Sequence, residues 1–247
     1  MSTHSERGFT IIEVVLFLAI TGALLAGLLI GVNAGITQQR YLDSVRSYKT
    51  FLQDQYAEVL NTRNSRDNQW RCDTGGAAQD GASNSTPGTS ECVILGRKIQ
   101  IIDNGKSVRV ANVTGRLSAA AGASDRSEDL TAYQPKVLPD GSPESETWEV
   151  DWGSHLKLNA TSDFPVGSEP VVLILRSPAS GVLKIFTSPA DVDLVTMVKP
   201  ENAATYTAAL CHYIDGDSGA MPKQWIRINP AVGAADGIET SEGGCRA

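Results

Sequence analysis

The sequence lacks most of the groups on which catalysis, cofactor binding and nucleic-acid binding depend. It has three histidines and four cysteines, and the cysteines form no CxxC pair and have no histidine at the spacing of a zinc ligand. It contains neither a phosphate-binding loop nor a dinucleotide-binding fingerprint. The net charge is −7, and no basic cluster follows residue 62, so contacts with nucleic-acid phosphates are not indicated. We therefore expect no catalytic residue, no cofactor and no metal, and a structural or binding role.

Two short patterns resemble sites and are weak. Residues 215–221, "DGDSGAM", contain the GDSG found around the nucleophile of trypsin-like proteases. That chemistry needs a histidine and a buried aspartate beside the serine, and only His155 and His212 could serve, because His4 lies near the amino terminus. Asp215 and Asp217 could bind calcium, but an Asp-rich loop with its late Glu is absent. A polar turn between two strands explains the string better.

Proline is absent before Pro87, and charge is nearly absent from residues 9–32. This 24-residue run contains Glu13 as its only charge, and as a helix it would be about 36 Å long, enough to cross a bilayer. A core helix of a soluble domain would show a polar stripe, and this run has none. A cleaved signal peptide is the alternative, although its apolar core is usually shorter. The run predicts a membrane-spanning helix.

Glu13 is an unusual residue for a membrane-spanning helix. A carboxylate inside a membrane costs roughly 2.5–3.5 kcal/mol on insertion scales, so such residues usually mark a function and have a partner. No Lys, Arg or His lies on the same helical face within two turns on the C-terminal side. The partner must come from another chain or from a newly made amino terminus nearby, unless Glu13 simply lies shallow enough to reach the lipid headgroups.

The residues around Glu13 resemble a known amino terminus. A short polar leader, Gly8, then Phe9 and "TIIE" precede the apolar helix, and Glu13 is the fifth residue counted from Phe9. This pattern is similar to type IV pilins and type II secretion pseudopilins, and the likeness covers about the first 50 residues. It implies that a prepilin peptidase cleaves between Gly8 and Phe9 and methylates the new amino group of Phe9. It also implies that Glu13 pairs with the amino terminus of a neighbouring subunit during assembly.

The charges that flank the helix point the other way. Arg7 is the only Lys or Arg of the leader, whereas Arg40, Arg46 and Lys49 follow the helix. The positive-inside rule would place the C-terminal side in the cytoplasm. The motif and the cysteines favour the opposite orientation, with the C-terminal domain outside the cytoplasm.

An even number of dispersed cysteines in an exported domain is typical of disulfides. Four cysteines allow three pairings, and the sequence does not choose among them. We expect the local pairing, in which Cys72 bonds to Cys92 and Cys211 bonds to Cys245. A disulfide that closes the last segment of the chain also resembles pilins.

The helix is expected to continue past the membrane as one helix from about Phe9 to Thr62. After Gly35, apolar residues recur at spacings of three and four and define one face of an amphipathic helix: Tyr41, Leu42, Val45, Tyr48, Leu52, Tyr56, Val59 and Leu60. This half should pack on the soluble domain. The glycines at 27, 31 and 35 either form a ridge for close helix contacts or are tolerated in a lipid-facing helix.

Residues 63–247 are the size of one domain and are rich in short β-like runs separated by turns, which favours antiparallel pairing. The predicted strands are 92–102, 107–113, 147–152, 155–160, 169–177, 181–188, 206–214 and 224–230. Residues 171–175 are continuously apolar and predict a central strand. Residues 73–91 and 118–146 are expected to be exposed loops, and "GIETSEGG" near the end is expected to be a tail. The predicted class is α+β, a long N-terminal helix packed on an antiparallel β-sheet domain.

The predicted organisation has four parts: leader 1–8, membrane-spanning half-helix 9–32, amphipathic half-helix 33–62 and extracytoplasmic β-rich domain 63–247. The resemblance implies a single-pass membrane protein that later becomes a subunit of a type IV pilus or pilus-like filament at the cell surface. A minor or tip pilin, acting in assembly, adhesion or motility, is favoured. Its partners would be other pilin subunits, the prepilin peptidase, the inner-membrane assembly platform and, before assembly, membrane lipid. The alternatives are a pseudopilin of a type II secretion or competence system, and a membrane-anchored binding protein that does not polymerise.

Overall fold

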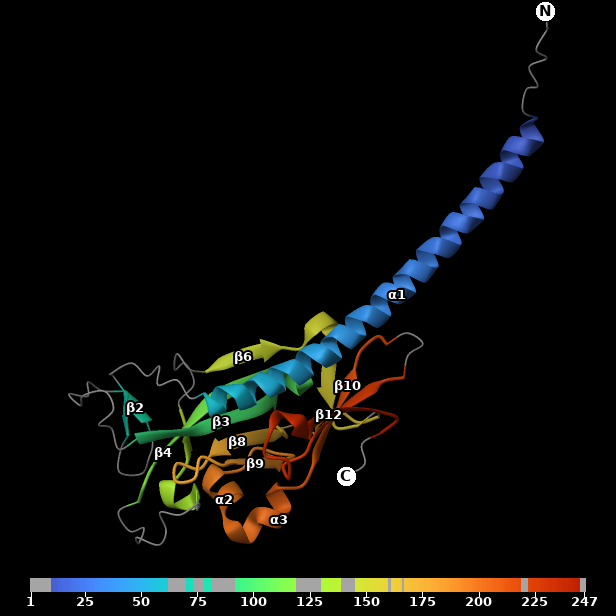
Figure 1. The fold of residues 1–247 in the computed structure, drawn as a ribbon. Coiled ribbons are helices and arrows are strands. Elements are labelled where there is room, and N and C mark those ends of the chain that lie inside the picture. Colours follow the sequence, from blue (N-terminus) through green and yellow to red (C-terminus); the bar gives the residue numbers. More distant parts are fainter. Residues whose placement is uncertain are drawn as a thin grey trace, which may run out of the picture.

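The helix α1 (Ile11–Leu60) projects from a β-rich domain in the computed structural model of the chain (Figure 1). The structure describes residues 10–61, 70–72, 78–80, 92–118, 130–138, 145–159, 161–165, 167–218 and 222–244. α1 is one uninterrupted helix of 50 residues, which corresponds to roughly 75 Å. The prediction of a single long helix is confirmed, although Phe9 and Thr62, its expected limits, lie outside the described residues.

The two halves of α1 have different surroundings. Residues 11–36, which we call the exposed half-helix, have no buried side chain, and nothing lies near the four glycines within it. Residues 37–60, the docked half-helix, lie against the domain and bury six of the eight residues predicted for the apolar face: Tyr41, Val45, Tyr48, Leu52, Tyr56 and Val59. Leu42 is half-buried, and Leu60, at the last turn, is exposed.

The larger sheet has six strands, all paired in antiparallel fashion. Its order is β5 (Lys136–Val137), β4 (Ser107–Arg116), β3 (Cys92–Ile102), β8 (Val171–Arg176) and β9 (Leu183–Ser188), with β6 (Glu146–Glu149) paired to the other end of β4. β8 lies between two strands and is buried along most of its length, so the prediction of a central strand at 171–175 is confirmed.

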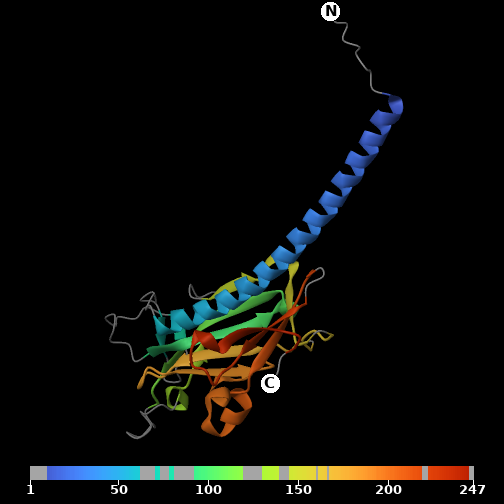
Figure 2. The same ribbon diagram turned by 45° about the vertical axis from the view of Figure 1, so that its right-hand side comes forward.

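The smaller sheet has four antiparallel strands. Its order is β12 (Ile238–Glu242), β11 (Gln224–Ile228), β10 (Leu210–Asp215) and β7 (His155–Lys157). A separate hairpin joins β1 (Trp70–Cys72) to β2 (Ala78–Asp80). The α+β class with antiparallel sheets is confirmed, and Figure 2 shows the strands gathered beneath the docked half-helix.

Alternate residues of β8 belong to two different cores, as the period of two in a strand requires. Val172 and Ile174 join the core under α1, together with isoleucines of β10, β11 and β12. Leu173 and Leu175 face the other side of the sheet. There they pack with the short helix α2 (Leu194–Val198), while α3 (Ala203–Tyr206) contributes Tyr206 (Figure 1). The larger sheet is therefore covered on both faces, by α1 on one and by short helices on the other.

Several expectations about the domain were wrong in detail. The segment expected as a tail forms β12, which pairs with β11 over five residues. β2 lies within 73–91, and η3 (Leu130–Tyr133) and β5 lie within 118–146, so neither stretch is entirely loop. The run at 206–214 begins as strand only at Leu210, because α3 occupies its start. The run at 147–152 ends in a tight turn, η4 (Asp151–Gly153).

Gly105 lies where the two sheets approach each other, and a side chain has no room there. It ends the turn η1 (Asp103–Gly105) between β3 and β4, and its φ of +84° is one that L-residues rarely adopt. A Cβ at this position would collide with the backbone carbonyl of Leu156 in β7.

We expect Gly105→Ala to lower the free energy of unfolding by more than about 2 kcal/mol, since the left-handed backbone and the collision both oppose the alanine. Denaturant unfolding of the full chain in detergent micelles, followed by near-ultraviolet circular dichroism, measures this. Gly153→Ala is the matched control: its φ is +69° but nothing lies within 4 Å. Gly153→Ala should lower the free energy of unfolding only through the left-handed backbone, by about 1 kcal/mol. Equal losses in the two variants would contradict the role of the close approach.

Candidate functional site

The exposed half-helix carries most of the exposed large hydrophobic side chains of the described chain. Its Ile, Leu, Val and Phe side chains are 44–84% exposed, and they surround the helix on all sides. α1 is long and apolar enough to cross a membrane and could anchor the chain there, with the β domain as a soluble body. In water so much exposed apolar surface would be strongly unfavourable. This surface is therefore the best candidate for a membrane-contacting site.

The first turn of α1 shows what Glu13 does within one chain. Thr10 is the N-cap, and its hydroxyl accepts a hydrogen bond from the backbone N–H of Glu13 at 3.3 Å. In return the Glu13 carboxylate accepts from the backbone N–H of Thr10 at 3.4 Å. This is a capping box, and its Thr-x-x-Glu pattern before an apolar run is visible in the sequence. Sequence reasoning missed it because it looked only for a cationic partner.

The capping box leaves Glu13 free to exchange partners. Both bonds are long for N–H···O contacts, whose usual length is about 2.9–3.0 Å, so they are weak. The pair is exposed, and among the described residues no Lys or Arg forms an ion pair with Glu13. A carboxylate at a helix N-terminus is also favoured by the helix dipole. Gly8 and Phe9, the predicted cleavage and methylation residues, lie outside the described residues.

One of the four predicted disulfide cysteines can be placed. Cys211 lies half-buried on β10, opposite Arg227 of β11, and is disulfide-bonded. Cys72 and Cys92 lie on β1 and β3, but their side chains, like Cys245 as a whole, are outside the described part of the chain. The pairing therefore stays a prediction.

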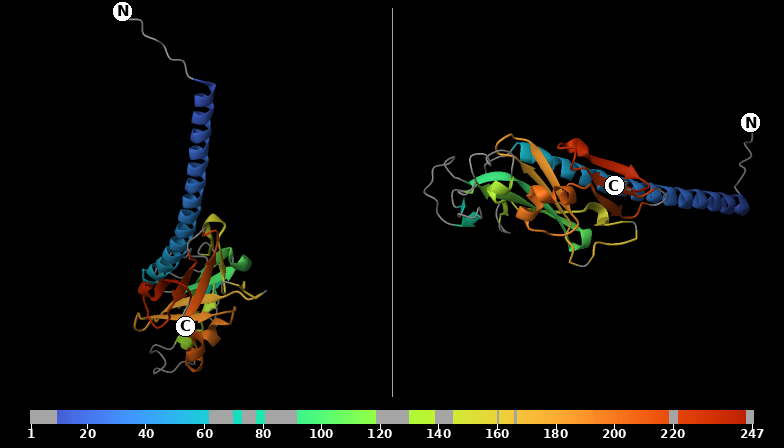
Figure 3. Two further views of the ribbon diagram at one scale, coloured as in Figure 1. Left: turned by 90° about the vertical axis from the view of Figure 1, so that its right-hand side faces the viewer. Right: turned by 90° about the horizontal axis from the view of Figure 1, so that it is seen from below.

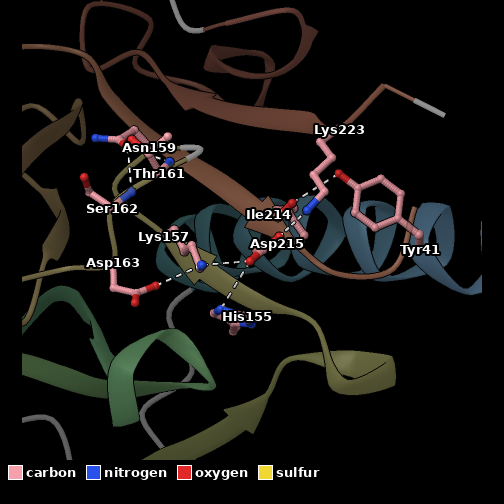
Figure 4. Close-up of polar contacts among 10 residues, drawn as sticks. All are labelled: Tyr41, His155, Lys157, Asn159, Thr161, Ser162, Asp163, Ile214, Asp215 and Lys223. Carbon is pink, nitrogen blue, oxygen red and sulfur yellow. Dashed lines mark hydrogen bonds and ion pairs between the residues drawn. The ribbon is translucent and has the colours of Figure 1, made fainter. Parts of the chain in front are cut away.

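A second group of polar residues fixes the point where α1 leaves the domain (Figure 4). The buried Tyr41 hydroxyl donates to the backbone carbonyl of Ile214 at 3.2 Å and accepts from the backbone N–H of Gln224 at 2.6 Å. One side chain of α1 thus satisfies backbone groups of β10 and of the start of β11. Because both partners are backbone groups, this contact sets the position of the helix on the smaller sheet.

Beside Tyr41, the carboxylate of Asp215 gathers three basic side chains (Figure 4). Lys157 Nζ lies 2.8 Å from one carboxylate oxygen, the Lys223 ammonium contacts the other, and His155 Nε2 is 3.6 Å away. Lys157 also pairs with Asp163 at 3.1 Å. Burial opposes ionisation, but hydrogen bonds from the two lysines lower the pKa of Asp215 to about 2. The cluster ties β7 to β10 and to the residue before β11.

The protease-like string at 215–221 and the possible calcium ligand Asp215 both lie in this region, and the structure gives their residues other contacts. The oxygens of Asp215 are occupied by ammonium groups, which is the wrong environment for a calcium ligand. In the described part of the chain, no group of three or more His, Cys, Asp or Glu residues could hold a metal. His155 faces Asp215, and His212 is hydrogen-bonded to Tyr48, so both histidines that could have served Ser218 are engaged elsewhere.

His212 is buried at the centre of the contact between α1 and the sheets. Its Nδ1 and the Tyr48 hydroxyl oxygen lie 2.6 Å apart, and both residues are fully buried. The rings of Phe164 and His212 lie nearly perpendicular to each other, while Trp148 stacks on Tyr48 and Phe51. Burial lowers the pKa of His212 to about 3 and raises that of Tyr48, so the pair is neutral at pH 7.

Comparison with known proteins supplies no relative: no family model, no curated protein and no solved structure matches the chain significantly.

The buried His212 makes stability depend on pH. Its pKa is lower in the folded chain than the ordinary value of about 6.5. Below pH 6.5 this histidine is therefore protonated in the unfolded chain but stays neutral in the folded chain. Stability should be intact above pH 6.5 and should fall by about 1.4 kcal/mol per pH unit as the pH decreases towards 3. Between pH 6.5 and 4.5 the loss should reach about 2–3 kcal/mol.

His212→Asn should flatten this dependence, because the amide keeps a hydrogen-bonding group near the Nδ1 position and does not titrate. Unfolding free energies between pH 7 and 4.5 measure the slope. His155→Asn removes a histidine at the edge of the domain and should leave the slope in place. An unchanged slope in His212→Asn would assign the pH dependence to other groups.

Proposed function

We propose that the chain is a prepilin whose mature form is a subunit of a type IV pilus or a related filament, as a minor or tip subunit. The observation that carries this proposal is the exposed half-helix, an apolar segment about 39 Å long that the domain leaves uncovered and that has Glu13 as its only charge. Lipid covers this segment before assembly, and the helices of other subunits cover it afterwards.

The first turn supplies the chemistry of assembly. The resemblance at residues 8–15 assigns cleavage to the bond between Gly8 and Phe9, which creates an amino group four residues before Glu13. In a filament core that excludes water, an unpaired carboxylate is costly, and a cation from a neighbouring subunit removes that cost. The weak contacts of the capping box allow Glu13 to exchange Thr10 for such an amine.

The disulfide at Cys211 supports a domain outside the cytoplasm, because reducing compartments rarely keep such bonds. It opposes the orientation indicated by Arg40, Arg46 and Lys49. With the domain outside, these basic residues follow the helix on its extracytoplasmic side, and the leader is accessible to a prepilin peptidase and the assembly platform at the inner membrane.

One observation favours a second function. The capping box explains Glu13 without any neighbour, so a membrane-anchored binding protein that never polymerises accounts for the same geometry. A pseudopilin of a secretion system would use Glu13 as a pilin does. The two tests below separate pilin-like assembly from the anchored monomer.

Glu13→Gln separates the two roles of this residue. Glutamine serves in a capping box as glutamate does, so the first turn should stay capped. The charge is lost, however, and loss of one partner of a buried ion pair costs about 3–5 kcal/mol, so incorporation into filaments should fall by roughly a hundredfold or more. Sheared filament fractions from cells that carry the assembly machinery measure incorporation.

Thr10→Ala is the matched control. It removes the cap, at a cost of about 1 kcal/mol, and keeps the carboxylate, so incorporation should persist. Failure of Thr10→Ala together with normal incorporation of Glu13→Gln would identify Glu13 as a helix cap and refute the pairing in assembly.

The mature protein should begin at methylated Phe9. Gly8→Val should block cleavage, because the added side chain occupies the space of a hydrogen in the peptidase site. Intact mass and amino-terminal sequencing of membrane fractions decide this. An uncleaved leader in wild-type protein, or a cut after residue 30, would contradict the prepilin proposal.

A further inference from the structure

Trp152 stands out on the surface of the β domain. It is 60% exposed, more than any other described aromatic side chain of this domain, and it occupies the middle of the turn η4. Its backbone is left-handed, with φ 57° and ψ 29°, a conformation that is strained for a bulky residue. Strain that persists at an exposed position, where the side chain adds little to packing, points to a role outside the folding of the domain.

The turn lies at the end of the domain from which the exposed half-helix emerges. Figure 1 shows η4 as the yellow turn after β6, beside α1, and the left panel of Figure 3 shows it at the top of the domain. The guanidinium carbon of Arg40 lies 5.1 Å from the centre of the Trp152 ring, which is within the range of a cation–π contact. The ring therefore lies at the same level along the helix axis as Arg40.

That level coincides with the surface of a bilayer if α1 spans it. Residues 11–36 extend about 39 Å, longer than the hydrocarbon core of about 30 Å and close to the 40–45 Å that includes the headgroups. Thr37, Gln38 and Gln39 follow, and Arg40 is one turn beyond Ile36. Arg40 and the Trp152 ring thus lie at the outer edge of the headgroup layer.

Tryptophan is the residue enriched at this level in membrane proteins, because its ring is apolar and its indole N–H needs an acceptor. Within the described part of the chain, no hydrogen bond is recorded for the Trp152 indole. Ester and phosphate oxygens of lipids are acceptors, and phosphate also complements the guanidinium of Arg40.

We propose that Trp152, held by Arg40, is an interfacial anchor that inserts into the lipid headgroup layer and fixes the domain against the membrane before the subunit enters a filament. This inference rests on the proposed membrane placement of α1. Because α1 is one continuous helix, the anchor holds the helix and the domain together at one depth and tilt in the membrane, and the contact is released when the helix is withdrawn from the lipid.

Depth-dependent quenching tests this in the full chain, reconstituted into vesicles of phosphatidylcholine and phosphatidylglycerol. The fluorescence of Trp152 is the difference between wild type and Trp152→Phe, each measured with a nitroxide on the lipid headgroup or near the end of the acyl chain. We expect the headgroup nitroxide to quench the Trp152 signal at least about twofold more than the deep one. Trp225→Phe is the matched control: Trp225 lies on β11 against Tyr213, and its difference signal should be quenched by neither label.

Flotation of the same samples tests the membrane placement of α1 separately from the insertion of Trp152. Chains that float with the vesicles while the Trp152 signal stays unquenched would overturn the anchor and leave the membrane placement of α1 intact. This outcome includes a Trp152 buried against a second copy of the chain. Chains that do not float would overturn both, and the prepilin proposal with them.

Discussion

The docking of the second half of α1 on the two sheets is the interaction on which the rest of the structure depends. α1 is a single stiff element, so whatever fixes residues 37–60 also fixes the direction in which residues 11–36 leave the domain. Three fully buried tyrosines on one face of the helix, Tyr41, Tyr48 and Tyr56, supply much of the contact. A fully buried aromatic side chain contributes about 1.5–3 kcal/mol to stability. Here this burial stabilises a helix whose stability comes mostly from packing against the domain.

The apolar side chains in this contact supply the affinity of the helix for the domain. The polar groups fix the position of the helix on the sheets. Tyr41 bonds backbone atoms of the smaller sheet, and Tyr48 bonds His212 of β10. On the side of the larger sheet, Arg97 of β3 donates to Gln55 of α1 at 2.6 Å. Its contacts with the exposed Glu58 and Glu146 are longer and add little. Among the described residues, His212 Nε2 and the Tyr56 hydroxyl are buried without a hydrogen-bond partner, which costs some stability.

The elements that could be predicted are those with a hydrophobic pattern within one segment of the sequence. The helix follows from an apolar run continued by apolar periodicity, the central strand β8 follows from a short continuous apolar run, and β3 matches its predicted limits, 92–102, because a turn ends it at Asp103. β12 could not be predicted, because "IETSE" is mostly polar and is a strand only through its partner β11. α2 is a helix of five residues that its Asp193 cap and the opposite face of the sheet stabilise, which no single segment reveals. In the candidate site, Glu13 was found from its charge, whereas the contacts of Trp152 and His212 required distant residues to come together.

In the proposed assembly, the environment of Glu13 would change while the helix that carries it stays the same. In a single chain the carboxylate caps the first turn through Thr10, an interaction worth about 1 kcal/mol where water competes for the same groups. Between packed apolar helices water is absent, and a nearby ammonium group outweighs a neutral N–H because charge-assisted bonds are roughly twice as strong. The same residue thus caps the helix in a single chain, and under the proposal it would favour a charged neighbour once helices cluster. The docking of residues 37–60 keeps Glu13 at a fixed distance from the domain, so under the proposed assembly an exchange of its partner would set the axial position of the whole subunit.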